Sequence, residues 1–296
     1  MSHNKLKVDQ LNKLIVIVGP TASGKTNLAI ELAKKYNGEI ICADSRTIYR
    51  YMDVGTAKPT LDEQQSVPHH LLDIVDPNIH FSVVEFKTLC NKTIEDIQDR
   101  GKLPIMVGGS GMYIDSVLFD YQFRSQNSNI DISGMSLEEK QQKALSLYPS
   151  EIMQIDVKNE RRVDQLLQRG PSQSKDRESL KKECKIIGLS IKTPLLKQKI
   201  ESRTKQMLNN GIVQETKKII RIFGNECPAL NTIGYKQVAS VMDGEVNEKE
   251  LENAINRATI GLAKRQITWF KRNKAIVWVD STMNAKEEAK NYLQKK

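Results

Sequence analysis

Cysteine pairs, long apolar runs and an apolar leader are all missing from this sequence. The four cysteines, Cys42, Cys90, Cys184 and Cys227, are scattered and form no CxxC pair, which favours neither a disulfide framework nor a zinc site. No apolar run reaches the roughly 18 residues of a membrane-spanning helix. Residues 1–13 are polar, which predicts no signal peptide. We therefore expect a cytoplasmic protein that does not contact a membrane.

Acidic residues are comparatively scarce in the last part of the chain. From Lys181 onward there are 23 Lys and Arg against 12 Asp and Glu, whereas the residues before it hold 22 and 24. A basic segment can attract a polyanion such as nucleic acid through the release of counterions. Lysines that only keep the surface soluble are the alternative, and charge alone does not decide between the two.

Local patterns predict the fold class. The 296 residues, 39% of them hydrophobic, exclude a mostly disordered chain and allow one large domain with an insertion, or two modest ones. Apolar runs at 14–18, 39–43 and 103–107 predict buried strands. Helical spacing of apolar residues predicts helices at 26–36 and 83–100. This alternation indicates an α/β fold with a doubly wound parallel sheet, in which ligands bind at the carboxyl ends of the strands.

The alternation weakens after residue 118, which predicts three parts. We expect the first part of the core at 1–118, a mostly helical insertion domain at 119–190, and completion of the core with basic helices at 191–296. Within these parts, apolar spacing predicts helices and one short strand. They are expected at 136–147, 195–209, 213–223, 248–274 and, for the strand, 277–279.

One segment between a predicted strand and a predicted helix fits the pattern GxxxxGK[ST]. It consists of Gly19, Pro20, Thr21, Ala22, Ser23, Gly24, Lys25 and Thr26. Glycines let the backbone wrap around phosphate with its N–H groups pointing inward, and the next helix directs the positive end of its dipole at the anion. Lys25 adds a mobile charge, and the Thr26 hydroxyl is placed to bind Mg²⁺. The fold is therefore expected to be P-loop NTPase-like and to bind a polyphosphate or pyrophosphate, without implying ATP hydrolysis.

Two polar residues follow neighbouring predicted strands. Hydrolysing P-loop proteins usually hold Mg²⁺ and the attacking water with an acid at the end of another strand. The strand at 103–107 is followed by glycines and Ser110, and the strand-end acid that can be placed is Asp44. Asp44 could accept a proton from an acceptor or only cap the next helix, and Ser110 could bond the same acceptor or be an ordinary turn serine. These residues favour a group-transfer enzyme whose donor carries phosphates.

Seven segments together resemble a known family. They are Gly19–Thr26, Asp44–Arg50, Met52–Pro59, His69–Asp73, Gly108–Tyr113, Gly234–Gln237 and Ala263–Trp269. Their order and spacing resemble the tRNA dimethylallyltransferases, or isopentenyl-tRNA transferases, from about Leu14 to Tyr121 and from about Ile200 to Asp280. Met52–Pro59 joined to the GxxxxGK[ST] segment is the most specific part. No paired-cysteine finger follows Asp280, so the resemblance is to the short bacterial form.

The resemblance implies a transferase that moves the dimethylallyl group of dimethylallyl diphosphate to the exocyclic N6 amine of the adenosine adjacent to the anticodon in tRNA, releasing pyrophosphate. Residues 19–26 would hold the diphosphate, with Mg²⁺ as cofactor on Thr26. Asp44 would be the general base for the amine, and Ser110, where the family usually has Thr, would help to orient it. The partners would be dimethylallyl diphosphate and the anticodon stem-loop of tRNA, and the protein would be a monomer.

A basic helix and the family segments predict the tRNA-binding residues. Arg257 and Lys264 lie seven residues apart and share a helical face, with Arg265 beside it. The basic charge of the last part favours RNA over a merely solvated face. The insertion is also expected to contact tRNA. The expected tRNA-binding residues are Asp44, Ser45, Arg46, Thr47, Arg161, Arg162, Gly234, Tyr235, Lys236, Gln237, Arg257, Lys264 and Arg265.

Besides Ser110, the chain departs from the family pattern at several positions. Ile260 and Gln165 stand where the family commonly has Arg, and Thr47 where it often has Gln. Alternative interpretations are a P-loop kinase of a small metabolite with Asp44 as base, an enzyme that prenylates free adenine nucleotides, and a non-catalytic RNA-binding protein with a degenerate P-loop. The basic last part argues against the first two, whereas Ile260 and Gln165 are the best support for the third.

Overall fold

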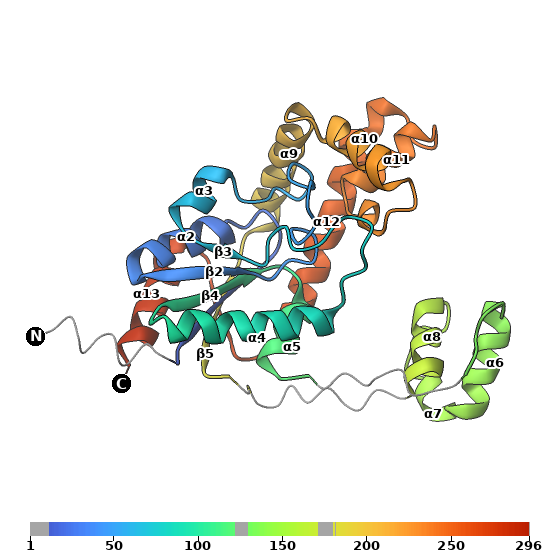
Figure 1. Ribbon diagram of the computed structural model, residues 1–296, viewed down its shortest axis with the longest axis horizontal. Helices are drawn as coiled ribbons and strands as arrows, with labels where there is room; N and C mark the ends of the chain where they lie inside the picture. Colours follow the sequence, from blue (N-terminus) through green and yellow to red (C-terminus); the bar gives the residue numbers. More distant parts are fainter. Residues whose placement is uncertain (1–11, 122–129, 171–179, 181, 296) are drawn as a thin grey trace, which may run out of the picture. The chain divides into compact units, whose positions relative to one another are not determined.

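The computed structural model describes residues 12–121, 130–170, 180 and 182–295. The chain divides into two units, which we call the core unit (Met1–Leu118 with Leu180–Lys296) and the helical unit (Phe119–Ser179). The core unit contains a six-stranded sheet with helices on both faces (Figure 1). The predicted α/β fold with a parallel sheet is therefore confirmed.

All strand pairs of the sheet are parallel, in the order β3-β2-β4-β1-β5-β6. The strands are β1 (Leu14–Val18), β2 (Gly38–Cys42), β3 (His69–His70), β4 (Leu103–Gly108), β5 (Cys184–Leu189) and β6 (Ile276–Val279). Every residue of β1 is buried, because β1 lies between β4 and β5 and is covered on both faces. This explains the unbroken apolar run of β1.

Alternate strand residues pack against different helices. Ile105 and Val107 of β4 belong to the cluster formed with α2 (Lys25–Tyr36) and α13 (Thr282–Gln294). Met106 points the other way and contacts Cys90 of α4 (Val83–Asp99) through sulfur atoms 3.7 Å apart. The structure adds α3 (Leu61–Ser66) before β3 and α5 (Gly111–Leu118) after β4.

Four further helices of the core unit follow β5. They are α9 (Thr193–Asn209), α10 (Ile212–Phe223), α11 (Tyr235–Met242) and α12 (Leu251–Phe270), with 3₁₀ turns at Pro228–Asn231 and Glu248–Glu250. α9 lies beside α12 (Figure 1), and Leu196 and Ile200 of α9 pack against Ala263 of α12. α12 therefore brings residues from near the end of the chain next to the sheet and α9.

The helical unit consists of α6 (Leu137–Leu147), α7 (Pro149–Ile152) and α8 (Glu160–Arg169). It has its own small apolar cluster around Ala144, Val163 and Leu167. The nearly buried Lys140 ammonium binds Glu160 at 2.7 Å and Asp164 at 3.0 Å. This unit is as helical as the sequence predicts.

The predicted insertion at 119–190 was too long at its carboxyl end. Cys184–Leu189 is β5, which pairs with β1 and β6 in the core sheet. The strand was not predicted from the sequence because lysines flank its apolar part, which is only Ile186–Leu189 with Gly188 inside it. No helix in the described ranges is both long and apolar enough to cross a membrane.

Candidate active site

A cavity of about 350 Å³ lies where β1, β2 and β4 end. Its position agrees with the rule that parallel α/β sheets bind ligands beyond the carboxyl ends of their strands. The turns after these strands, the segment 56–59 and the helices α9 and α12 all contribute to its walls. The polar residues of these walls include Thr21, Lys25, Thr26, Asp44, Thr47, Thr56, Lys58, Arg203 and Gln266.

The GxxxxGK[ST] segment forms the turn between β1 and α2. Gly24, with φ 90°, directly precedes the first residue of α2, and Ala22 also has a positive φ of 62°. The Lys25 ammonium folds back and donates a hydrogen bond to the Pro20 carbonyl oxygen at 2.6 Å. The turn therefore holds the lysine charge beside the N-terminus of α2, where an anion is favoured.

Burial changes the ionisation of Lys25. It lowers the pKa of Lys25 from 10.5 to about 8, because desolvation disfavours the ammonium. The nearby Asp44 carboxylate raises this pKa, and the Arg203 guanidinium lowers it further. Near neutral pH the lysine still carries its proton and offers a positive charge to a ligand.

A second cation, Arg203 of α9, lies at the same cavity. Its Nη1 donates to the Thr21 hydroxyl at 3.3 Å, and its Nη2 donates to the Thr56 carbonyl oxygen at 3.0 Å. Burial lowers the pKa of Arg203 and Asp44 raises it, but an arginine stays protonated in proteins. Arg203 and Lys25 together suit a ligand with several negative oxygens, such as a diphosphate.

Gln266 of α12 joins the turn after β1 to the turn after β4. Its Oε1 accepts a hydrogen bond from the Thr21 N–H at 2.8 Å, and its Nε2 donates to the Gly109 carbonyl oxygen at 3.1 Å. A Cβ atom at Gly109 would lie 2.3 Å from Nε2, so this close approach requires glycine. Gln266 therefore sets the spacing of two cavity walls that are remote in sequence.

Asp44 begins a tight turn at the end of β2. Its Oδ1 accepts a hydrogen bond from the Arg46 N–H at 2.9 Å, and its side chain is part of the cavity wall. Ser110 is tied to this turn, since its hydroxyl accepts from the Ser45 N–H at 2.9 Å and donates to the Ser45 hydroxyl at 3.2 Å. Ser110 thus touches the neighbour of Asp44, and it is not one of the described residues that form the cavity wall.

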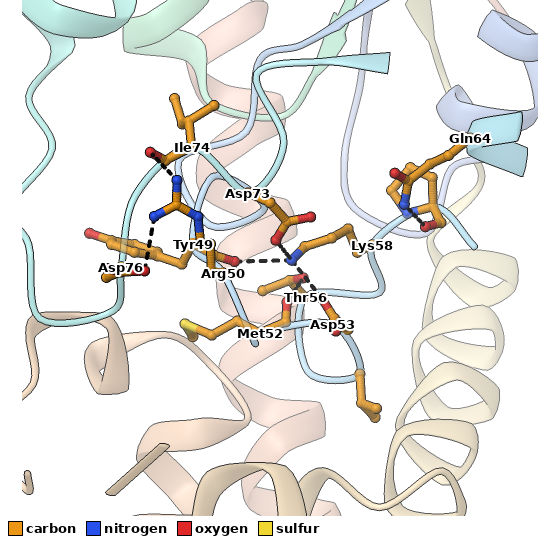
Figure 2. Close-up of polar contacts among 12 residues, drawn as sticks. Tyr49, Arg50, Met52, Asp53, Thr56, Lys58, Gln64, Asp73, Ile74 and Asp76 are labelled. Atoms are coloured by element: carbon orange, nitrogen blue, oxygen red, sulfur yellow. Dashed lines mark hydrogen bonds and ion pairs between the residues drawn. The ribbon is translucent and has the colours of Figure 1, made fainter. Parts of the chain in front are cut away.

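The Lys58 side chain binds residues 49–53, which follow the Asp44 turn, and Asp73 (Figure 2). Its ammonium donates to the Tyr49 carbonyl oxygen at 3.0 Å and binds the carboxylates of Asp53 at 2.6 Å and Asp73 at 2.5 Å. The Lys58 side chain is only 3% exposed, whereas both carboxylates reach solvent. Because Lys58 crosses from residues 49–53 to Asp73, it joins two loops at one edge of the cavity.

The adjacent histidines His69 and His70 both have partners within the protein. His69 Nδ1 lies 2.7 Å from the Val67 carbonyl oxygen, and His70 Nε2 lies 2.7 Å from the Glu39 carboxylate. Burial lowers the pKa of His69. Among the described residues, no group of three or more His, Cys, Asp or Glu side chains could hold a metal ion.

Comparison with known proteins decides the family. The model of the IPP transferase family matches residues 47–273. This chain belongs to the IPP transferase family. The tRNA dimethylallyltransferase of Anoxybacillus flavithermus is 40% identical over 283 residues, 91% of each chain.

Solved structures of other IPP transferases agree. The tRNA isopentenylpyrophosphate transferase of Bacillus halodurans superposes with a TM-score of 0.76 at 33% identity, covering 96% of this chain and 97% of that one. The tRNA delta(2)-isopentenylpyrophosphate transferase of Staphylococcus epidermidis gives 0.74 at 32% identity, covering 96% and 99%. The sequence resemblance is thereby confirmed along nearly the whole chain.

In this IPP transferase the expected tRNA-binding residues differ in their exposure to solvent. Seven of them are cationic side chains that are exposed, namely Arg46, Arg161, Arg162, Lys236, Arg257, Lys264 and Arg265. Asp44 and Ser45 are half-buried at the cavity turn. Thr47 is 9% exposed but takes part in the cavity wall, so it is reachable only from inside.

The expectation for the GYKQ segment was partly wrong. Gly234 is buried and Tyr235 is 0% exposed, so the Tyr235 side chain has no surface to offer RNA. Its hydroxyl is bonded to Glu215 and to the Gly55 N–H. Gln237 accepts a hydrogen bond from the Gly234 N–H at 2.8 Å. In this IPP transferase the segment supports the fold around the cavity, and Lys236 is its exposed member.

Sequence reasoning missed Arg203, Gln266 and Glu215 as residues of the site. Gln266 lies inside the segment Ala263–Trp269, but nothing local distinguishes it from its neighbours. Arg203 and Glu215 lie on α9 and α10, where helical periodicity indicates which side is buried but not what that side contacts. A polar or charged residue on the buried side of these helices was the signal available.

Proposed function

We propose that this chain transfers the dimethylallyl group of dimethylallyl diphosphate to the N6 amine of the adenosine adjacent to the anticodon in tRNA, with release of pyrophosphate. One observation carries the proposal: a single cavity unites the two cations Lys25 and Arg203 with the carboxylate of Asp44. Membership of the IPP transferase family and relatives named as tRNA dimethylallyltransferases support the same reaction.

The donor's diphosphate binds on the side of residues 19–26. N–H groups at the start of α2, the Lys25 ammonium and the Arg203 guanidinium neutralise its charge. Thr26 places a hydroxyl in the cavity wall, where it would hold Mg²⁺ together with the donor's phosphate oxygens. Such an ion would stabilise the negative charge of the leaving pyrophosphate. The protein's own cations serve the same end.

The acceptor adenosine enters from the side of Asp44. Its carboxylate accepts a proton as the amine nitrogen bonds to the allylic carbon and the carbon–oxygen bond to pyrophosphate breaks. Ser110 orients the acceptor through the Asp44–Ser45 turn that it holds. The adenosine has to leave its stack in the anticodon loop to reach this cavity.

The tRNA backbone binds to exposed cations on both units. Arg257, Lys264 and Arg265 of α12 and Lys236 of α11 are exposed on the core unit, and Arg161 and Arg162 on the helical unit. Such contacts supply affinity and register for an RNA substrate. Because the substrate is tRNA, we place the reaction in the cytoplasm, with the protein acting as a monomer.

Labelled dimethylallyl diphosphate and unmodified tRNA test the function. We expect Mg²⁺-dependent transfer of label to tRNA, and a loss of more than about 100-fold in kcat for Asp44→Asn, which keeps the side chain's size but not its basicity. Binding of tRNA by Asp44→Asn should stay within about twofold of the wild type. Transfer from ATP, transfer to free adenine nucleotides, or full activity of Asp44→Asn would contradict the proposal.

A further inference from the structure

The carboxylate of Glu215, on α10, binds three consecutive backbone N–H groups. Its oxygens accept hydrogen bonds from the N–H of Asp53 at 3.0 Å, of Val54 at 3.0 and 3.1 Å, and of Gly55 at 3.1 Å. Successive N–H groups that converge on one anion form a strong binding concavity for it. A half-buried acid about 160 residues away in sequence therefore holds the turn at 53–55.

Tyr235 completes this arrangement from α11. Its hydroxyl donates to Glu215 Oε1 at 2.5 Å and accepts from the Gly55 N–H at 3.1 Å. Burial raises the pKa of Tyr235, so the hydroxyl keeps the proton that it donates. A Cβ atom at Gly55 would lie 2.4 Å from the Tyr235 ring, so the ring fits only against glycine. Glu215, Tyr235 and Gly55 are thus matched to one another.

The turn held by Glu215 continues directly into the cavity wall. Residues 56–59 line the cavity, and the Thr56 carbonyl oxygen accepts the hydrogen bond of Arg203 Nη2. The Nη1 atom of the same guanidinium donates to the Thr21 hydroxyl in the GxxxxGK[ST] segment. A shift of the turn would therefore move one of the two partners that orient Arg203.

Lys58 also contacts this segment (Figure 2). The Lys58 N–H donates to the Asp53 carbonyl oxygen at 3.0 Å, and its ammonium binds the Asp53 carboxylate. The Thr56 hydroxyl donates to the Met52 carbonyl oxygen at 2.6 Å. These bonds set the internal shape of the turn, whereas Glu215 and Tyr235 fix where the turn lies relative to α10 and α11.

We propose that Glu215 and Tyr235 are positioning residues for the donor: through the turn at 53–55 and the Thr56 carbonyl group, they orient Arg203 toward the diphosphate. The inference rests on the proposed function in one respect, that the anion in the cavity is the diphosphate of the prenyl donor. Neither residue is among the described residues that line the cavity, and Glu215 acts through backbone N–H groups.

Steady-state kinetics of Glu215→Gln and Tyr235→Phe test this role. The glutamine keeps the size of the side chain, but its NH₂ group cannot accept hydrogen bonds from the backbone N–H groups. Because the turn then loses part of its support, we expect the KM for dimethylallyl diphosphate to rise about tenfold. Tyr235→Phe keeps the ring against Gly55 and removes one hydroxyl, and we expect a rise of about threefold. The Kd of tRNA should stay within about twofold in both variants. Glu226→Gln, an exposed glutamate beyond the end of α10, is the matched control and should behave as the wild type.

A double-mutant cycle with Arg203→Lys identifies the route of the effect. If Glu215 acts through the guanidinium, Glu215→Gln should raise the donor KM by less than about threefold once Arg203 is lysine. Binding of inorganic pyrophosphate, measured by calorimetry, should weaken in parallel with the donor KM in the single variants. Effects that multiply fully in the double variant would overturn the proposed route.

Other outcomes also decide the matter. A lower Tm with an unchanged donor KM would show that Glu215 only stabilises the fold, and an equal rise in the Kd of tRNA would place its effect on the acceptor side. If Glu215→Gln does not fold, Tyr235→Phe decides by the same measurements. A wild-type protein that transfers no prenyl group contradicts the proposed function, whereas an active wild type with unchanged variants contradicts only this inference.

Discussion

The side-chain oxygen of Gln266 lies 2.8 Å from the backbone nitrogen of Thr21, although 245 residues separate them in sequence. Through its Nε2 the same amide also holds Gly109, next to Ser110. One side chain on α12 thus connects the turn expected to hold the donor with the turn expected to serve the acceptor.

Gln266→Glu should lower the rate of prenyl transfer. One carboxylate oxygen can still accept from Thr21, but the other would face the Gly109 carbonyl oxygen and repel it. Losing one such bond costs about 1.4 kcal/mol, or about tenfold in kcat/KM. Gln198→Ala, an exposed glutamine on α9, is the control. Unchanged kcat/KM in Gln266→Glu and Gln266→Ala would show that the bridge is not needed for transfer.

Donor affinity should fall as the pH rises through about 8, because burial lowers the pKa of Lys25 to about 8 in the donor-free protein. Below that pH the ammonium is charged and binds phosphate, and above it the neutral amine does not. Pyrophosphate binding measured from about pH 6.5 to 9 checks this expectation. Lys25→Arg keeps its charge throughout this range, so comparison with it removes the titration of pyrophosphate itself. An identical pH dependence in both proteins would contradict the role of Lys25.

Glu39 should stabilise the fold only where it is ionised. Its carboxylate is 2% exposed and binds Arg100, Lys102 and His70. The hydrogen bonds from Arg100 above all, then those from Lys102 and His70, hold the pKa of Glu39 well below 4.5, against the effect of burial. Because the folded-state pKa is lowered, this stabilisation is present above about pH 4.5 and is lost as the pH falls toward the folded-state value.

Glu39→Gln should therefore lower the free energy of unfolding by about 2 kcal/mol at neutral pH, and by less near pH 3, where part of the linked stabilisation has been lost. Urea unfolding at both pH values measures the difference. Glu31→Gln removes an exposed partner of Lys286 and should change stability by less than about 1 kcal/mol. A loss for Glu39→Gln that is equal at both pH values would argue against an electrostatic origin.

The basic face of α12 should contribute to tRNA affinity. Lys264→Ala combined with Arg265→Ala removes two exposed charges. We expect weaker tRNA binding, and the slope of log Kd against the logarithm of the salt concentration should decrease in magnitude by about one to two. Filter binding at several salt concentrations measures both quantities. Lys290→Ala, an exposed lysine on α13, should leave them unchanged. An unaltered salt dependence in the double variant would remove this face from the RNA surface.

Local sequence was sufficient wherever one segment contains the whole signal. The buried strand 14–18, the glycine-rich turn and the helix that begins at Lys25 were predicted together, because apolar runs, glycine and helical spacing act within a few residues. The predicted strand at 39–43 begins and ends one residue later than β2, Gly38–Cys42. Asp44 was predicted as a site residue because it directly follows the predicted strand. β5 was missed because charged residues border its short apolar part.

The sequence was thus enough to predict the strands β1, β2, β4 and β6, the glycine-rich turn before α2, the acid that follows β2 and the family. It was not enough to predict Arg203 as the second cation, Gln266 as the bridge, or Glu215 and Tyr235 as the support of the turn at 53–55. Each of these side chains acts on backbone groups that lie between 147 and 245 residues away. Helical periodicity shows that a side is buried, but only tertiary packing determines which backbone groups that side meets.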